Sequence, residues 1–209
     1  LDIDIETLDD GRFIVSWEEG PVDGSLFGAN TYNFNVRAAI FDPRDEENSP
    51  NVYIGDQVVG TIDDDNINVT PSDRAVYGWD GNDAFFFDPG DAIFGDRFDG
   101  GSGDDKIVIE SGLVDFAGSF LTSFEEVEFS TNGVPALAKV VQFSSQDFGN
   151  GALSSQLHVD GRSAASTPDI IRFNMDQSSL DLSGLTFQNW GSQDRIEVIG
   201  DGSSETITG

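Results

Sequence analysis

Residues 100–108 form a glycine-rich nonapeptide whose residue types suit the binding of a hard cation. They read Gly-Gly-Ser-Gly-Asp-Asp-Lys-Ile-Val and fill every slot of the pattern G-G-x-G-x-D-x-U-x, in which U is a large apolar residue. Glycines allow a tight turn with positive φ and leave carbonyl oxygens uncovered, and Asp105 adds an anionic oxygen. Because Ca²⁺ takes about six to eight oxygen ligands, the segment predicts a calcium-binding turn that leads into a short strand.

Further copies of this pattern lie upstream at a regular spacing. Residues 78–86 form a second copy, and residues 60–68, which precede it by 18 positions, form a degraded third copy with Asp63 in place of a turn glycine. The intervening residues 69–77 keep the apolar slot but place Arg74 in the Asp slot. The copy at Gly100 starts 22 residues after Gly78, so four residues are inserted there. The spacing predicts stacked turns, with the inserted residues bulging at one edge.

The elements that must position these turns are short strands. Two runs, 11–17 and 32–41, have strand character before the repeats, and six more follow at 124–129, 139–143, 156–159, 169–173, 180–182 and 195–199. Helix signals are confined to a short segment near 144–154. The sequence therefore predicts an all-β fold, a parallel β-roll or β-helix (solenoid) with a few N-terminal antiparallel strands. We expect strands of a partial repeat or cap in 1–50, the calcium-binding roll in 51–110, and a solenoid continuation in 111–209.

Composition narrows the classes of partner. The chain has 209 residues with 39 acidic against 10 basic side chains, a formal charge of −29, and 17 phenylalanines, which provide for a core. Nucleic acid is excluded as a partner because phosphate binding needs Lys and Arg, and no membrane insertion is expected. A halophilic surface or a disordered acidic tail would also be acidic, but the apolar content fits disorder poorly. With no cysteine, disulfides and thiol metal sites are excluded, and bound cations are the natural source of stability.

On the nonapeptides at 78–86 and 100–108, the chain resembles the RTX (repeats-in-toxin, haemolysin-type calcium-binding) family. Residues 113–129, 180–187 and 200–209 are similar to the β-solenoid segments between RTX blocks in large bacterial surface proteins, and 8–17 to a strand repeat of such proteins. The resemblance implies a type I-secreted protein at the cell surface or outside the cell, part of a larger chain with flanking domains, that folds on binding Ca²⁺.

The resemblance also implies which residues enclose the ions, because turn carbonyls and Asp side chains of stacked turns do so in the family. Asp65 and Asp83 are expected to stack on one edge, with Asp105 beyond them. Arg74 departs from the pattern, so no calcium is expected beside it, and its guanidinium is expected to pair with Asp91 or Asp96. The expected metal-site residues are Asp63, Asp65, Gly78, Asp80, Gly81, Asp83, Asp91, Asp96, Asp99, Gly101, Gly103 and Asp105.

Other residues that could do chemistry have simpler explanations. His158, the single histidine, lies in an alternating run and is expected on a strand surface. Paired acids such as Glu125-Glu126 resemble a glycosidase pair, yet adjacency by chance is expected among 39 acids. Trp79 is expected to be partly exposed, and a sugar-stacking role for it and for Trp17 and Trp190 is less common than packing. The segment 160–163 is expected to be a turn.

The sequence thus predicts a calcium-binding structural module and not an enzyme. The alternative is an auxiliary carbohydrate-binding module of a polysaccharide-active enzyme, of the kind attached to alginate epimerases or lyases. Extracellular polysaccharide or a cell surface would then be a partner, although ten basic residues in a field of −29 disfavour a direct grip on an anionic polymer. A β-helical lyase or epimerase is a third, weaker option, because the Tyr, His, Arg or Lys cluster that it needs is not evident.

Overall fold

The computed structural model divides the chain into two compact units, Leu1–Ser49 and Pro50–Gly209. It describes residues 3–7, 13–19, 35–41, 52–54, 57–131, 137–149, 151–162 and 166–209. In the first unit, β1 (Ile3–Thr7), β2 (Phe13–Glu19) and β3 (Asn35–Phe41) form an antiparallel sheet in the order β1-β2-β3. The strands expected at 11–17 and 32–41 correspond to β2 and β3, and residues 11, 12 and 32–34 lie outside the described residues.

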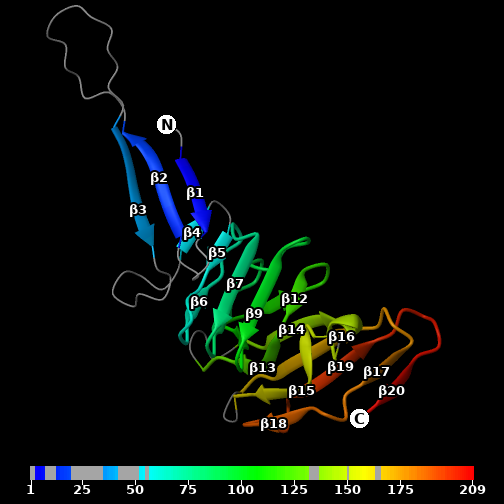
Figure 1. Cartoon of the computed structure of the whole chain (residues 1–209). Helices are drawn as coiled ribbons and strands as arrows, with labels where there is room; N and C mark the ends of the chain where they lie inside the picture. Colours follow the sequence, from blue (N-terminus) through cyan, green and yellow to red (C-terminus); the bar gives the residue numbers. More distant parts are fainter. Residues whose placement is uncertain are drawn as a thin grey trace, which may run out of the picture. The chain divides into compact units, whose positions relative to one another are not determined.

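Two parallel sheets dominate the second unit (Figure 1). The six-stranded sheet has the order β18-β15-β13-β10-β8-β6, with the bounds β6 (Asn66–Asn68), β8 (Ala84–Phe87), β10 (Lys106–Ile109), β13 (Phe124–Phe129), β15 (Leu153–Asp160) and β18 (Thr186–Gln188). The five-stranded sheet has the order β12-β9-β7-β5-β4, with the bounds β4 (Val52–Ile54), β5 (Gln57–Val59), β7 (Ala75–Asp80), β9 (Arg97–Ser102) and β12 (Phe120–Thr122). Only β4 pairs antiparallel among the described strands of these two sheets.

From β5 to β10, consecutive strands alternate between these two sheets. Asn66 pairs with Ala84 and Ala84 with Lys106, so the chain returns to the six-stranded sheet after 18 and then 22 residues. The other sheet has the same two spacings, from Gln57 to Ala75 and from Ala75 to Arg97. The stacking and the four-residue insertion predicted from the nonapeptides are confirmed.

The remaining strands form two smaller parallel sheets. One has the order β11-β14-β16-β19, with the bounds β11 (Leu113–Asp115), β14 (Lys139–Ser144), β16 (Asp169–Asn174) and β19 (Arg195–Ile199); the other pairs β17 (Ser179–Asp181) with β20 (Thr206–Thr208). Beyond residue 110 the six-stranded sheet continues without interruption through β13, β15 and β18. All six strands expected between 124 and 199 are present, and the all-β, parallel character of the fold is confirmed.

The core consists of apolar side chains aligned from strand to strand. Ile67, Phe85 and Ile107, which fill the U slots, are register partners and have no exposed surface. The ring of Phe116, directly after β11, stacks on that of Phe143 in β14 with centroids 5.3 Å apart. Each aromatic residue that packs against its counterpart one level away removes apolar surface that a single level could not bury.

The short helical segment expected near 144–154 is limited to one 3₁₀ turn. A single 3₁₀ turn, Ser145–Asp147, is capped by Ser144 and is followed by β15. Gly149 and Gly151 adopt positive φ (78° and 85°), a conformation that ends a right-handed helix. None of the described residues forms a helix with the length and apolarity needed to cross a membrane.

Replacement of Phe143 with alanine is expected to lower the free energy of unfolding by about 3–5 kcal/mol, because the cavity would lie between stacked rings. Phe94 provides a matched control, since its side chain is 81% exposed, and Phe94→Ala is expected to change stability by less than about 0.5 kcal/mol. Denaturant unfolding followed by circular dichroism measures both. Equal effects of the two substitutions would contradict this account of the core.

Candidate functional site

The nonapeptide turns form one stack at one end of the paired sheets. We call residues 60–65, 78–83 and 100–105 the Gly-Asp loops; each connects a strand of the five-stranded sheet to a strand of the six-stranded sheet. Their first glycines cannot be replaced, because a Cβ on Gly78 would lie 2.1 Å from Asp83 Oδ2 and 2.3 Å from the carbonyl oxygen of Gly100. The same slot at Gly60 and Gly100 is equally crowded by carbonyl and carboxylate oxygens.

The second and third Gly-Asp loops share one backbone conformation, which the first loop lacks. Trp79 and Gly101 have φ of 84° and 104°, and Gly81 and Gly103 have φ of 115° and 145°. Thr61 and Asp63, in the corresponding slots of the first loop, are not among the residues with positive φ. Trp79 is 41% exposed, which confirms its expected partial exposure. The degraded copy therefore forms a different turn, and only the two complete copies have the geometry of the motif.

The motif carboxylates form a buried column, which we call the carboxylate column: Asp65, Asp83 and Asp105. The backbone N–H of Asp65 donates to Oδ1 of Asp83 (2.8 Å), and that of Asp83 donates to Oδ1 of Asp105 (2.8 Å). The N–H of Asp105 donates in turn to Oε2 of Glu125 (3.0 Å). The predicted stacking of Asp65, Asp83 and Asp105 is confirmed, and Glu125 extends the series at a position that the motif does not predict.

The second oxygen of each carboxylate distinguishes the first level from the others. Asp65 Oδ2 accepts hydrogen bonds from the backbone N–H and the hydroxyl of Thr61 (2.5 and 3.0 Å). Oδ2 of Asp83 and Oδ2 of Asp105 are buried and have no hydrogen-bond partner among the described residues. Since a buried charged oxygen without a partner is destabilising, these two atoms are the ones that call for a ligand.

Burial raises the pKa of both carboxyl groups, to about 7 for Asp83 and about 6 for Asp105. The backbone N–H donors oppose this effect, and neighbouring carboxylates add to it: Asp105, Asp65 and Asp64 for Asp83, and Glu125, Asp104 and Asp99 for Asp105. No basic side chain is among the causes of either shift. Without a cation, protons are therefore the remaining means of neutralising the column.

A second ladder runs along the outside of the same loops. The N–H of Asn82 donates to Oδ1 of Asp64 (2.7 Å), and the N–H of Asp104 donates to Oδ1 of Asn82 (2.9 Å). This outer ladder is exposed, and its two acceptors are the carboxylate of Asp64 and the carboxamide of Asn82. It therefore needs no negative charge, in contrast to the carboxylate column.

Asp91 and Asp96 lie at the opposite end of the sheets, in the connection between β8 and β9. Oδ2 of Asp91 accepts from the N–H of Asp88 (2.6 Å), and Oδ2 of Asp96 accepts from the N–H of Ile93 (2.7 Å), so each closes a tight turn. Arg74 Nη1 lies 2.8 Å from Asp96 Oδ1, as the sequence predicts for one of its two candidate partners. Both carboxylates therefore already have hydrogen-bond or ion-pair partners within the protein.

The other expected ligands are spread around the Gly-Asp loops. Asp80 is exposed at the end of β7, and Asp63 is exposed in the first loop. Asp99 lies on β9, and burial raises its pKa while Arg97 and the N–H of Gly101 oppose the shift. None of these three belongs to the buried column.

Oxygen atoms of the second and third loops nevertheless fit a hard cation. A Cβ on Gly101 would lie 1.8 Å from the carbonyl oxygen of Trp79, and one on Gly103 would lie 1.8 Å from that of Gly81, so only glycines allow these carbonyls to approach. In the described part of the chain no group of three or more His, Asp or Glu side chains is placed to hold a metal ion. An ion here would depend on carbonyl oxygens together with Asp83 and Asp105, a set that suits Ca²⁺.

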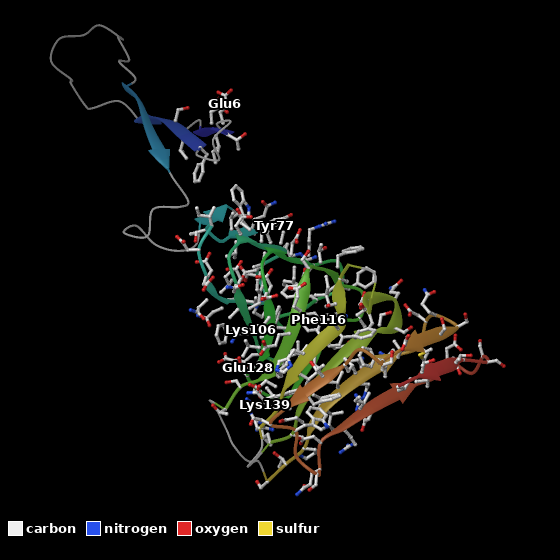
Figure 2. All side chains as sticks on the ribbon, turned by 60° about the horizontal axis from the view of Figure 1, so that its bottom comes forward. Glu6, Tyr77, Lys106, Phe116, Glu128 and Lys139 are labelled. Atoms are coloured by element: carbon white, nitrogen blue, oxygen red, sulfur yellow. The ribbon has the colours of Figure 1, made fainter. Side chains whose placement is uncertain are left out.

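A second set of buried charges, which the sequence did not predict, lies beyond β13. Arg162 Nη2 and Nε donate to Oδ1 of Asp169 at 2.6 and 2.8 Å, and both side chains are buried. Lys139, the register partner of Asp169, is also buried; its Nζ donates to the carbonyl oxygens of Ile109 (3.2 Å) and Ser130 (Figure 2). Burial lowers the pKa of Lys139. Burial also raises the pKa of Asp169, and the hydrogen bonds from Arg162 oppose that rise. Here the protein supplies its own cations.

The remaining candidates occupy ordinary structural positions. His158 lies on β15, as expected, with Nδ1 3.0 Å from Thr186 Oγ1. Glu126 is the register partner of His158, and burial raises its pKa. Lys106, on the neighbouring strand, pairs with Glu128 at 2.7 Å (Figure 2). Trp190 packs against Phe129 and Phe187.

The raised pKa values predict that the calcium-free protein loses stability as the pH rises. The carboxyls of Asp83 and Asp105 have an ordinary pKa of 3.8 when unfolded, against about 7 and about 6 in the fold, so the folded state binds more protons in between. The stabilisation from these protons is complete below the unfolded pKa, and it is lost as the pH rises through the folded pKa values. In chelator, the melting temperature is therefore expected to be lower at about pH 8 than at about pH 5. The double variant Asp83→Asn/Asp105→Asn is expected to reduce this dependence. Asp64→Asn removes only the smallest contribution to the shift of Asp83 and is expected to change the dependence much less. An unchanged slope in the double variant would contradict the assignment.

Removal of the Arg162 guanidinium is expected to destabilise the protein strongly, because the buried carboxylate of Asp169 loses the side chain that donates two hydrogen bonds to it. Arg162→Met is expected to lower the free energy of unfolding by about 3–5 kcal/mol, in calcium and in chelator alike. Arg195 pairs with Glu197 but is 50% exposed, so Arg195→Met is expected to change it by less than about 1 kcal/mol. Denaturant titration of the two variants tests this, and similar losses would show that the buried pair is not special.

Comparison with protein family models, with curated proteins and with solved structures finds no match to this chain. The two complete Gly-Asp loops and their unpartnered carboxylate oxygens are therefore the features on which a functional assignment depends.

Proposed function

We propose that this chain is a calcium-binding structural module of a secreted RTX-type protein. The observation that carries the proposal is the pair of buried oxygens, Asp83 Oδ2 and Asp105 Oδ2, that lack a partner among the described residues. They lie beside backbone carbonyls that only glycine leaves accessible. When bound, Ca²⁺ would supply the positive charge that this column lacks.

The expected calcium ligands all lie in the second and third Gly-Asp loops. Asp83 and Asp105 would contribute carboxylate oxygens, and residues 78–82 and 100–104 would contribute carbonyl oxygens. Asp65 is satisfied by Thr61, and Asp96 by Arg74 and a turn N–H. We therefore expect calcium between the two complete copies and none at the opposite end of the sheets.

The architecture supports a β-roll that continues as a β-helix. Strands β5 to β10 alternate between two parallel sheets at spacings of 18 and 22 residues. Farther on, β13 and β15 keep the parallel pairing at a larger spacing, with Glu126 paired to His158. A solenoid whose levels beyond β13 are longer than those before it accounts for these pairings.

Secretion and folding outside the cell follow from the same reasoning. A formal charge of −29 with no cysteine disfavours compaction until cations are present, and calcium is plentiful outside cells. In this proposal the module is exported by a type I system, folds on meeting Ca²⁺, and spaces flanking domains of a larger chain. It has no catalytic role.

Calcium titration of the chelated protein tests the proposal. We expect calorimetry to detect binding, and circular dichroism to show a gain of β structure and a higher melting temperature. The variant Asp83→Asn/Asp105→Asn is expected to lose most of the calcium-induced rise in melting temperature, because it removes both unpartnered anionic oxygens.

Asp64→Asn is the matched control, since it removes one charge from a neighbouring exposed ladder in which Asn82 already serves as an acceptor. It is expected to keep the calcium response. A wild-type protein that is fully folded in chelator and binds no calcium would refute the proposal, as would equal calcium binding by the double variant and the wild type.

A further inference from the structure

Strand β15 departs from its neighbour over a short stretch. Phe124 pairs with Leu153 and Glu126 pairs with His158, so one residue of β13 faces four residues of β15. The three extra residues fall within Ser154–Leu157, of which Ser155 and Gln156 are exposed. Bulges of this kind change the direction of side chains and often lie next to binding sites.

Two hollows border this bulge, and Gln156 lines both. The larger has a volume of about 550 Å³, and its uncharged polar lining consists of Ser145, Ser155, Gln156, Gln177, Ser179 and Ser183. The smaller has a volume of about 360 Å³ and includes Asp104, Glu125 and Glu126. A chain-like ligand that passes over Gln156 would contact both hollows.

Hydrogen bonds fix the walls of the larger hollow. Asp176 Oδ1 accepts from the hydroxyl of Ser145 (2.6 Å), and Ser145 Oγ accepts from the N–H groups of Asp176 and Gln177 (both 3.1 Å). On the other side, Asp181 Oδ1 accepts from the N–H of Ser183 (3.0 Å). A Cβ on Gly184 would lie 2.0 Å from the carbonyl oxygen of Ser155, so the bulge and the 183–184 turn are in close contact. The hollow is therefore formed before any ligand binds.

The lining of the larger hollow is unusual for so acidic a protein. Asp181 is the single charged residue among the described residues that line it, and the buried side chains of Phe148 and Leu180 provide its apolar part. Hydroxyl and carboxamide groups both donate and accept hydrogen bonds, as sugar hydroxyls do. We propose that the two hollows form a binding site for a neutral oligosaccharide, with Gln156 and Gln177 as its main contacts.

Charge disfavours the other classes of ligand. An anionic polymer would face Asp181 at one end and Asp104, Glu125 and Glu126 at the other. A cationic ligand would gain from the smaller hollow alone and would make no use of the neutral one. A neutral sugar chain can donate hydroxyls to the carboxylates and can both donate to and accept from the serines and glutamines.

Binding is tested on the intact chain in calcium buffer, with neutral xylan, glucan and mannan oligosaccharides, an oligogalacturonate and a chitosan oligomer as probes. Saturation-transfer NMR and calorimetry are expected to detect at least one neutral oligosaccharide and neither charged one. The variant Gln156→Ala/Gln177→Ala is expected to weaken binding by on the order of tenfold. Gln193→Ala is the control, because this exposed glutamine lies outside both hollows.

The smaller hollow includes Asp104 of the third Gly-Asp loop, but Gln156 and Gln177 lie outside all three loops. The double variant therefore leaves the proposed calcium ligands unchanged, and calcium binding is measured separately. Circular dichroism verifies that each variant is folded. Absence of binding to every neutral probe, a preference for the anionic or cationic probe, or equal binding by the double variant and the control would overturn the proposal.

Discussion

Three stacked carboxylates, buried in one end of the second unit, impose the constraint on which the surrounding structure depends. A single line of hydrogen bonds from backbone N–H groups to carboxylates links Asp65, Asp83 and Asp105. No lysine or arginine contributes to the pKa shifts of Asp83 and Asp105. The column holds the loops in register, yet it concentrates negative charge where water is excluded. It is therefore stable only with protons or a bound cation.

The same protein neutralises other buried acids with its own side chains. Arg162 donates two hydrogen bonds to Asp169, whose register partner is the buried Lys139. Arg74 forms an ion pair with Asp96 at the end of the sheets opposite the Gly-Asp loops. These pairs make no use of an external ion. The contrast gives the second unit two kinds of electrostatic support: one depends on the solution around the protein, and the other is fixed in the chain.

Sequence reasoning succeeded where the motif repeats. The spacings of 18 and 22 residues and the burial of Ile67, Phe85 and Ile107 follow from the positions of residues in the nonapeptides. Arg74 pairs with Asp96, one of the two partners that the sequence left open. The short helical segment expected near 144–154 is limited to the 3₁₀ turn Ser145–Asp147, because Gly149 and Gly151 adopt positive φ and a β strand begins at Leu153. The hollows beside the β15 bulge carry no sequence signal at all.

By itself, the sequence determined the stacking of the Gly-Asp loops, because side-chain alternation and glycine conformations repeat at a fixed interval. It could not determine which carboxylates are satisfied. Thr61 donates hydrogen bonds to Asp65, and Arg162 donates hydrogen bonds to Asp169. These contacts depend on how each turn folds and not on the spacing of residue types. Only the tertiary structure separates Asp83 and Asp105 from the other acids of this chain, since burial and the absence of a partner arise when neighbouring levels enclose them.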